Sequence, residues 1–212
     1  MLMNGHLAWG LFGRLGAVAA TAVCVFALAP AVASAACGGV AQEKPRKNVS
    51  AGRAPIAIGD SPMLLALDAL AKRGYRANAR GCRQYREGLA LMRDLRRRDK
   101  LPRLVVVALG SNGSITKGDI HDALDIVGKK RTLGLVTPRE SGGGAGSDAA
   151  LVRSEAKKHK NRIELIDWVK YSAGHQGWFQ PDGLHLTFEG ADAMARLFAR
   201  ALKPLPPPNN AR

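Results

Sequence analysis

Acidic residues are scarce in this chain relative to basic ones, and the resulting charge bears on the partners that it can have. Against 32 lysines and arginines stand 17 aspartates and glutamates, so the formal net charge is +15, and aromatic residues make up 5%. An excess of positive charge is compatible with binding to nucleic acid. However, the sequence has no zinc-ligand spacing, no RNA-binding aromatic motif and no recognition-helix pattern. We therefore predict no nucleic-acid partner and assign most basic residues to solvated helix faces.

The N-terminal apolar run falls short of the ~20 residues that a membrane-spanning helix needs. This run, residues 15–29, follows Arg14, ends before Pro30 and leads into small residues at positions 31–36. A basic flank, an apolar segment and an Ala-Ser-Ala site are typical of a secretory signal peptide. We predict a signal peptide over residues 1–36, a secreted or extracytoplasmic product and no stable membrane span after cleavage. The alternative is an uncleaved membrane anchor. Outside the cytoplasm, the positive charge of the chain would favour an anionic cell-envelope polymer as a partner.

Cysteine is also rare, and cleavage of the leader would leave two of the three, Cys37 and Cys82. In an oxidising compartment these two thiols could pair and tie the N-terminal arm to the domain. The sequence does not give the distance between them, so the pairing stays open. Cys37 follows small residues as a lipidated cysteine does. Ser34 stands where an aliphatic residue is expected, which disfavours a lipid anchor.

The organisation of the chain predicts one α/β domain. Residues 37–53 are polar and contain proline, which predicts a linker, and the proline-rich residues 204–212 predict a disordered tail. Between them, residues 54–203 contain five apolar runs separated by helical patterns, at 56–58, 75–79, 104–109, 133–136 and 163–166. The run at 104–109 has no polar residue, as in a strand covered on both faces. The alternation predicts a three-layer α/β/α, doubly wound domain with five parallel strands.

Ser61 stands in the first of three unusual loops. The strand predicted at 56–58 runs into Gly59-Asp60-Ser61-Pro62, and a helical pattern begins at Met63. Ser61 would therefore occupy the N-cap, with proline at the first helical position, which is a favoured arrangement. A serine there could also act as a nucleophile, because the helix dipole and free N–H groups stabilise an oxyanion. The motif alone leaves both interpretations open.

Two further polar motifs follow later strands. Asn112 lies in the Gly-Ser-Asn-Gly segment 110–113, where it would either shape a glycine-rich turn or donate its amide to an oxyanion. Asp182 and His185 are separated by two residues after the fifth run. One interpretation is that His185 caps or packs beside the last helix. The other is that the two side chains pair, so that Asp182 accepts a hydrogen bond from His185 Nδ1–H and His185 Nε2 stays free to take a proton from a serine.

The three motifs all follow carboxyl ends of parallel strands, where the functional loops of open α/β sheets lie. Together they supply a nucleophile, an oxyanion donor, an orienting carboxylate and a base. We therefore predict that they meet at one edge of the sheet. Ser61 Oγ should lie within hydrogen-bond reach of His185 Nε2, with Asp182 against Nδ1.

At these motifs the chain resembles the SGNH (GDSL-type) hydrolases, and the resemblance extends over residues 54–202. Three family blocks have counterparts here, namely Gly59-Asp60-Ser61 for block I, Gly110-Ser111-Asn112 for block III and Asp182-Gly183-Leu184-His185 for block V. Within the superfamily the chain most resembles the extracytoplasmic SGNH domains of peptidoglycan O-acetyltransferase-like acyltransferases. Their Gly-Arg-Gln element is matched by Gly81-Cys82-Arg83-Gln84.

The resemblance implies a flavodoxin-like fold and an assignment for each site residue. Ser61, Asp182 and His185 would form the catalytic triad, and the oxyanion hole would use Ser61, Gly81 and Asn112. The implied substrate is an acylated carbohydrate, and we predict neither a cofactor nor a metal.

Pro62 separates this pattern from another family of serine enzymes. The nucleophile elbow of α/β-hydrolases needs Gly-x-Ser-x-Gly and uses the N–H of the residue after the serine. Pro62 has no N–H, and Met63 stands where the glycine would be. The elbow is therefore excluded, whereas an oxyanion hole that uses the serine's own N–H remains.

Three functions are compatible with the pattern. The leading one is a secreted serine esterase that removes acyl groups, O-acetyl above all, from cell-envelope glycans through an acyl-enzyme. The same acyl-enzyme would make an O-acyltransferase if a sugar hydroxyl replaced water and a membrane partner donated the acyl group. The third is a non-catalytic envelope-binding protein that kept the fold.

The glycine-rich residues 141–147 follow the fourth run and should emerge at the same edge as the site. Their composition predicts the most mobile segment of the domain, either a lid beside the acceptor or a tolerated surface insertion. Arg139 lies at the rigid end of this loop, and we predict that it binds the substrate.

Overall fold

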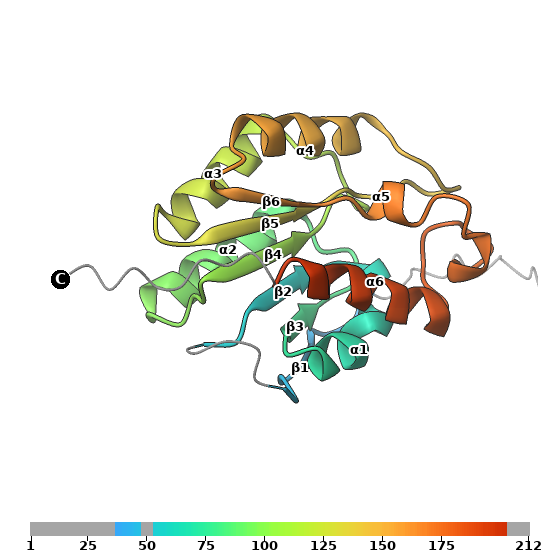
Figure 1. Ribbon diagram of the computed structural model, residues 1–212, viewed down its shortest axis with the longest axis horizontal. Coiled ribbons are helices and arrows are strands. Elements are labelled where there is room, and N and C mark those ends of the chain that lie inside the picture. Colours follow the sequence, from blue (N-terminus) through green and yellow to red (C-terminus); the bar gives the residue numbers. More distant parts are fainter. Residues whose placement is uncertain (1–36, 48–52, 203–212) are drawn as a thin grey trace, which may run out of the picture. The chain divides into compact units, whose positions relative to one another are not determined.

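The computed structural model describes residues 37–47 and 53–202, which fall within one compact unit. A six-stranded sheet with the order β1-β3-β2-β4-β5-β6 forms its middle layer (Figure 1). The five parallel strands are β2 Ile56–Gly59, β3 Arg76–Ala79, β4 Leu104–Ala108, β5 Thr132–Val136 and β6 Ile163–Ile166. All five lie at the predicted runs, and the predicted three-layer α/β class is confirmed.

Helices cover both faces of the sheet. They are η1 Ser61–Ala66, α1 Leu67–Lys72, α2 Tyr85–Arg97, α3 Lys117–Val127, α4 Ser147–Lys158, α5 Trp168–Tyr171, η2 Gln176–Trp178 and α6 Phe188–Arg200. Because successive side chains of a strand point to opposite faces, β4 contributes to two hydrophobic clusters. Val106 packs with residues of α1 and α6, whereas Val105 and Val107 pack with residues of α2, α3 and α4.

The sixth strand corrects two predictions, the linker over residues 37–53 and the strand count of five. Ala41–Glu43 form β1, which pairs antiparallel with β3 at the edge of the sheet. A disulfide joins Cys37 to Cys82, with 5.1 Å between the Cα atoms, and settles the pairing that the sequence left open. An ion pair from Arg46 to Asp68 on α1 (2.7 Å) holds the segment after β1. The sequence of β1 has no apolar run, and its position depends on pairing with β3 and on the disulfide, with Ala41 packed against the core.

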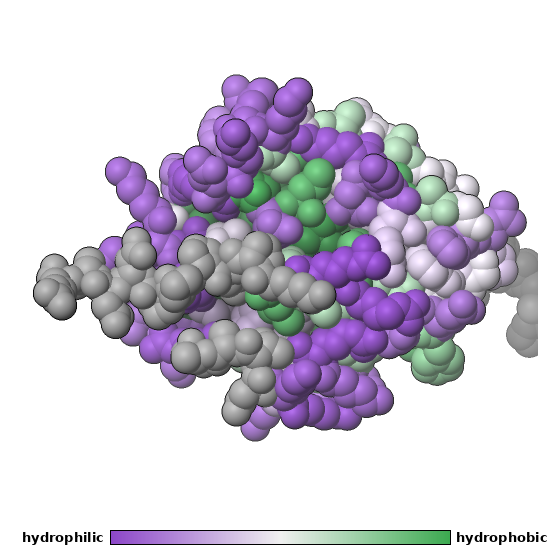
Figure 2. Space-filling view, in the orientation of Figure 1, coloured by the Kyte–Doolittle hydropathy of each residue, from purple (hydrophilic) through white to green (hydrophobic). Residues whose placement is uncertain are grey.

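The predicted signal peptide and the predicted C-terminal tail lie outside the described residues. Within the part of the chain that the structure describes, no helix is both long enough and apolar enough to cross a bilayer. Figure 2 shows strongly hydrophilic residues spread around the visible face, with apolar residues toward its middle.

Candidate active site

Ser61 is brought to the carboxyl edge of the sheet by a tight turn after β2. Gly59 permits the turn, because a Cβ there would lie 2.7 Å from the Cβ of Met63. Pro62 follows at the second position of η1, so the helix predicted from Met63 begins two residues earlier, as a 3-10 helix. The Ser61 hydroxyl faces His185 across this edge. Ser61 is the first residue of η1 and Asp60 is its N-cap, so the interpretation of Ser61 as a helix cap is wrong. The role of Ser61 as a nucleophile stays a prediction.

The serine, the histidine and the aspartate form a continuous hydrogen-bonded array. His185 Nε2 lies 3.0 Å from Ser61 Oγ, and His185 Nδ1 lies 2.5 Å from Asp182 Oδ2. The other carboxylate oxygen of Asp182 accepts the backbone N–H groups of Leu184 and His185, each at 2.9 Å. The predicted juxtaposition of the three side chains is confirmed.

Hydrogen bonding also favours the charged form of Asp182. Desolvation alone would raise the pKa of this carboxyl, but the hydrogen bonds from the His185 side chain and from two backbone N–H groups hold it below its usual range. An ionised Asp182 accepts a hydrogen bond from the Nδ1–H group of His185. The lone pair of His185 Nε2 is then directed at the Ser61 hydroxyl. The array can therefore remove the hydroxyl proton of a serine.

The turn that carries Asp182 and His185 depends on glycine. Gly183 has φ of +67°, and a Cβ there would lie 2.9 Å from the carbonyl carbon of Gly142. The Gly142 N–H donates to the Asp182 carbonyl oxygen at 2.8 Å. The glycine-rich loop predicted as a lid or an insertion thus lies directly against the turn of the triad.

Arg139, predicted to bind substrate, makes three contacts with the protein itself. Its Nε donates to the Gly183 carbonyl oxygen at 2.9 Å, and its Nη1 donates to Ser172 Oγ at 3.3 Å. Its guanidinium carbon lies 3.9 Å from the centre of the Phe179 ring, and burial lowers its pKa. These contacts make Arg139 a positioning residue for the turn of Asp182 and His185. A direct contact with substrate stays a prediction.

Asp60 and Ser111 form a buried network beside the nucleophile that sequence reasoning missed. One Asp60 oxygen accepts the Ser111 hydroxyl at 2.6 Å and the Ser111 N–H at 3.1 Å. The Asn112 amide is 3.4 Å from the same oxygen. Burial raises the pKa of Asp60 despite these hydrogen bonds. Asp60 precedes Ser61 and Ser111 precedes Asn112 in the sequence. This adjacency to predicted site residues could have indicated the network.

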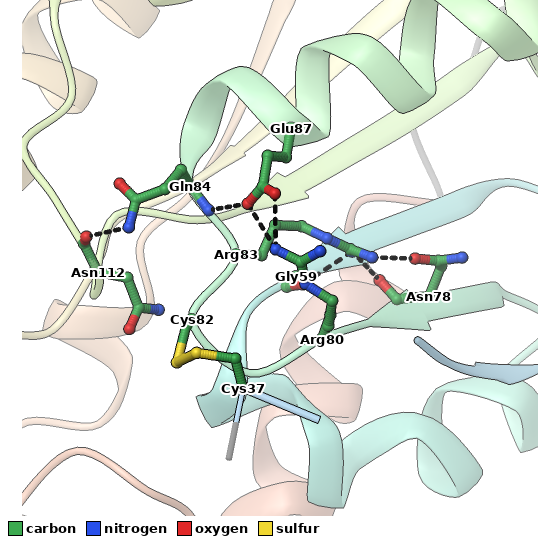
Figure 3. A network of polar contacts seen from close by, with 9 residues as sticks. All are labelled: Cys37, Gly59, Asn78, Arg80, Cys82, Arg83, Gln84, Glu87 and Asn112. Carbon is green, nitrogen blue, oxygen red and sulfur yellow. Dashed lines mark hydrogen bonds and ion pairs between the residues drawn. A yellow bond between two sulfur atoms is a disulfide. The ribbon is translucent and has the colours of Figure 1, made fainter. Parts of the chain in front are cut away.

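The segment after β3 holds the Asn112 loop from the other side (Figure 3). Gln84 Nε2 donates to the Asn112 carbonyl oxygen at 2.6 Å. The buried Arg83 guanidinium donates to the Gly59 carbonyl oxygen at 2.9 Å and to Asn78 Oδ1 at 2.7 Å. Arg83 thus joins β2 to β3, and the adjacent Gln84 contacts the loop after β4.

Gly81 lies in the turn before this segment, and a Cβ there would be 3.1 Å from the Cys37 carbonyl oxygen. Cys82, in the disulfide, has a positive φ of 54°. The N-terminal arm therefore packs against the predicted oxyanion glycine. Its role in the oxyanion hole stays a prediction.

The array opens to solvent through a shallow hollow. Ser61 and His185 line it together with Pro62, Leu64, Leu65, Gln180 and Leu186. The side chains of His185 and Asp182 are 38% and 41% exposed. The array is therefore accessible from solvent. Among the described residues, the group suited to a metal is His121, Glu155 and His159, and it contains no member of this array.

Comparisons with known proteins agree with the fold. No protein-family model matches the chain. The O-acetyltransferase OatA of Staphylococcus aureus is 37% identical over 99 residues, which are 47% of this chain and 16% of that protein. The match thus spans about a sixth of the length of this curated relative.

Solved structures extend the likeness over more of the chain. The C-terminal catalytic domain of the Streptococcus pneumoniae peptidoglycan O-acetyltransferase OatA is 26% identical, with a TM-score of 0.64 over 72% of this chain and 93% of that one. A member of the lipolytic G-D-S-L family from Veillonella parvula has a TM-score of 0.56 at 12% identity, over 73% of this chain and 100% of that one. The second likeness concerns the fold alone.

The class of protein follows from the sheet, the array at its carboxyl edge and these similarities. It is an α/β enzyme that carries serine, histidine and aspartate in hydrogen-bonded contact. The chain is similar in sequence to OatA proteins and in structure to the catalytic domain of one of them, and it shares its fold with solved SGNH and G-D-S-L hydrolases. The interpretation as a non-catalytic binding protein is therefore set aside.

Proposed function

We propose that the chain is an exported SGNH-type serine esterase that removes O-acetyl groups from cell-envelope glycans through an acetyl-enzyme on Ser61. The observation that supports this proposal is the contact of Ser61 Oγ with His185 Nε2 at 3.0 Å, in a hollow open to solvent. The predicted signal peptide and the net charge of +15 favour a substrate in an anionic envelope.

In the proposed mechanism, Ser61 Oγ attacks the acetyl carbonyl while His185 Nε2 takes its proton. Asp182 keeps the imidazole in the tautomer with Nδ1–H and stabilises the imidazolium that forms. The imidazolium then protonates the leaving sugar oxygen, and acetyl-Ser61 remains. Water attacks this ester with His185 as the base, and acetate leaves.

The oxyanion would be received by the N–H groups of Ser61 and Gly81 and by the Asn112 side-chain amide. The present hydrogen bonds of that amide, to Asp60 Oδ2 and to Ser111 Oγ, are both long at 3.4 Å. Bonds of this length are weak, so the amide can exchange them for a shorter bond to a developing negative charge.

O-acetyl transfer is the second candidate, and the similarity to O-acetyltransferases favours it. Acetyl-Ser61 would form in the same way, but a glycan hydroxyl would attack it in place of water. A membrane protein would then supply the acetyl donor. The two candidates share every residue of the array and differ in the acceptor.

One assay distinguishes them. The protein is incubated with an activated acetyl ester, with and without a peptidoglycan-derived oligosaccharide, and acetate is separated from acetylated glycan. Acetate alone supports the esterase, whereas acetyl-glycan that forms at the expense of acetate supports the transferase. Ser61→Ala is the control, and turnover by this variant would contradict both candidates.

A further inference from the structure

Three metal-ligating side chains gather on the two helices that cover one face of β5 and β6. His121 lies on α3, Glu155 lies on α4, and His159 follows the last residue of α4. One ligand atom from each comes within 4.8 Å of the others. Since α4 begins near the carboxyl edge of the sheet and His159 lies past its other end, the group is separate from the triad (Figure 1).

Glu155 is the centre of the group, and its side chain is 0% exposed. One carboxylate oxygen, Oε1, accepts from Lys158 Nζ at 2.7 Å. The other, Oε2, faces His121 Nε2 at 3.1 Å and His159 Nε2 at 3.6 Å. A buried carboxylate needs partners, and Lys158 satisfies half of this one. The hydrogen bond from Lys158 lowers its pKa, so the carboxylate is ionised at neutral pH.

Two of the three separations lie close to those of a tetrahedral metal site, and the two imidazole nitrogens lie within 4.8 Å of each other. Zinc binds imidazole nitrogen and carboxylate oxygen at about 2.0–2.2 Å, which places neighbouring tetrahedral ligands about 3.3–3.5 Å apart. The two nitrogen-to-oxygen distances lie on either side of that range. The imidazoles of His121 and His159 are 44% and 34% exposed, so a cation and its water ligands can enter from solvent.

We propose that His121, Glu155 and His159 bind a divalent transition-metal cation, with Zn²⁺ the best match to two imidazoles and a carboxylate. Glu155 would bind through Oε2 while Lys158 keeps Oε1, as hydrogen-bonded carboxylates do in metal sites. Each imidazole would bind through Nε2 and carry its proton on Nδ1. The cation would join α3 to α4 and stabilise the domain, separately from the chemistry of Ser61.

Zn²⁺ binding by the purified chain tests the proposal. After removal of metal with a chelator, calorimetric titration with Zn²⁺ should give saturable binding of one ion per chain, and Zn²⁺ should raise the melting temperature. His121→Gln and His159→Gln should each weaken this binding by about 100-fold or more and abolish the thermal shift. His175→Gln removes an exposed histidine outside the group and should change neither result.

A hydrogen-bonded cluster without a metal is the competing explanation. In that case the two variants would lower the melting temperature equally with and without Zn²⁺. Absence of saturable binding, or equal binding by wild type and both variants, would overturn the proposal. Circular dichroism of the metal-free variants establishes that they are folded, so loss of binding can be assigned to the ligands. Glu155→Gln, which keeps the shape of the buried side chain, provides an independent third variant.

Discussion

Two histidine–carboxylate groups in this molecule differ in the nitrogen that faces the carboxylate. At the sheet edge, His185 turns Nδ1 to Asp182 and leaves Nε2 on the Ser61 hydroxyl. Between α3 and α4, His121 and His159 both turn Nε2 to one buried carboxylate, Glu155. The first arrangement directs a base at a nucleophile, whereas the second directs three ligand atoms at one point.

Removing the nucleophile or the base should have the largest effect. Ser61→Ala and His185→Ala should each lower kcat for an activated acetyl ester by about 10⁴-fold or more. The double variant should be little worse than either, because the members of a triad act as a unit. Steady-state kinetics with Ser114→Ala, an exposed serine, as the matched control checks this. Wild-type turnover by Ser61→Ala would require a different nucleophile.

Asn112→Ala should have the next largest effect. Loss of one oxyanion donor should lower kcat by about 10²–10³-fold and leave KM nearly unchanged, because the amide is used only in the transition state. The measurement is kcat and KM with a small ester. A rise in KM alone would assign Asn112 to substrate binding instead.

Arg139→Lys should reduce kcat less, by about 10-fold, because Arg139 acts through the turn of Asp182 and His185. Lysine keeps the charge but cannot contact Gly183, Ser172 and the Phe179 ring together. If Arg139 positions the turn, kcat for a small ester should fall while KM is retained. An increase in KM restricted to a polymeric glycan would indicate the substrate contact that the sequence predicted.

The pH dependence of stability gives the smallest effect and compares the two carboxylates. The pKa of Glu155 and that of Asp182 are both lowered in the folded state. Each therefore contributes stability above its unfolded-state pKa, about 4 for both, and this contribution is lost as the pH falls through the lowered folded-state pKa. The melting temperatures of Glu155→Gln and wild type should differ at about pH 7, and the difference should shrink as the pH falls below about 4. Asp182→Asn should follow the same trend more weakly, because Asp182 is 41% exposed. Divergence toward low pH would contradict the assignment.

Much of the fold and of the triad could be predicted from the sequence because the evidence is local. Buried parallel strands such as β4 are continuous apolar runs. The motifs of Ser61 and Asn112 directly follow β2 and β4, whereas Asp182 and His185 follow β6 after α5 and η2. The edge strand β1 has no such run, and its position depends on pairing with β3 and on Cys37. His121 and Glu155 are 34 residues apart on different helices. Only the packing of α3 on α4 brings them together, so we predicted no metal.

Identification of the acylated residue tests the central claim most directly. The protein is incubated briefly with an activated acetyl ester, quenched in acid, digested and analysed by mass spectrometry. We predict one acetyl group per chain on Ser61 and no stable label on Ser61→Ala. Acetylation of another residue that turns over as fast as the substrate, with Ser61 unmodified, would contradict the account.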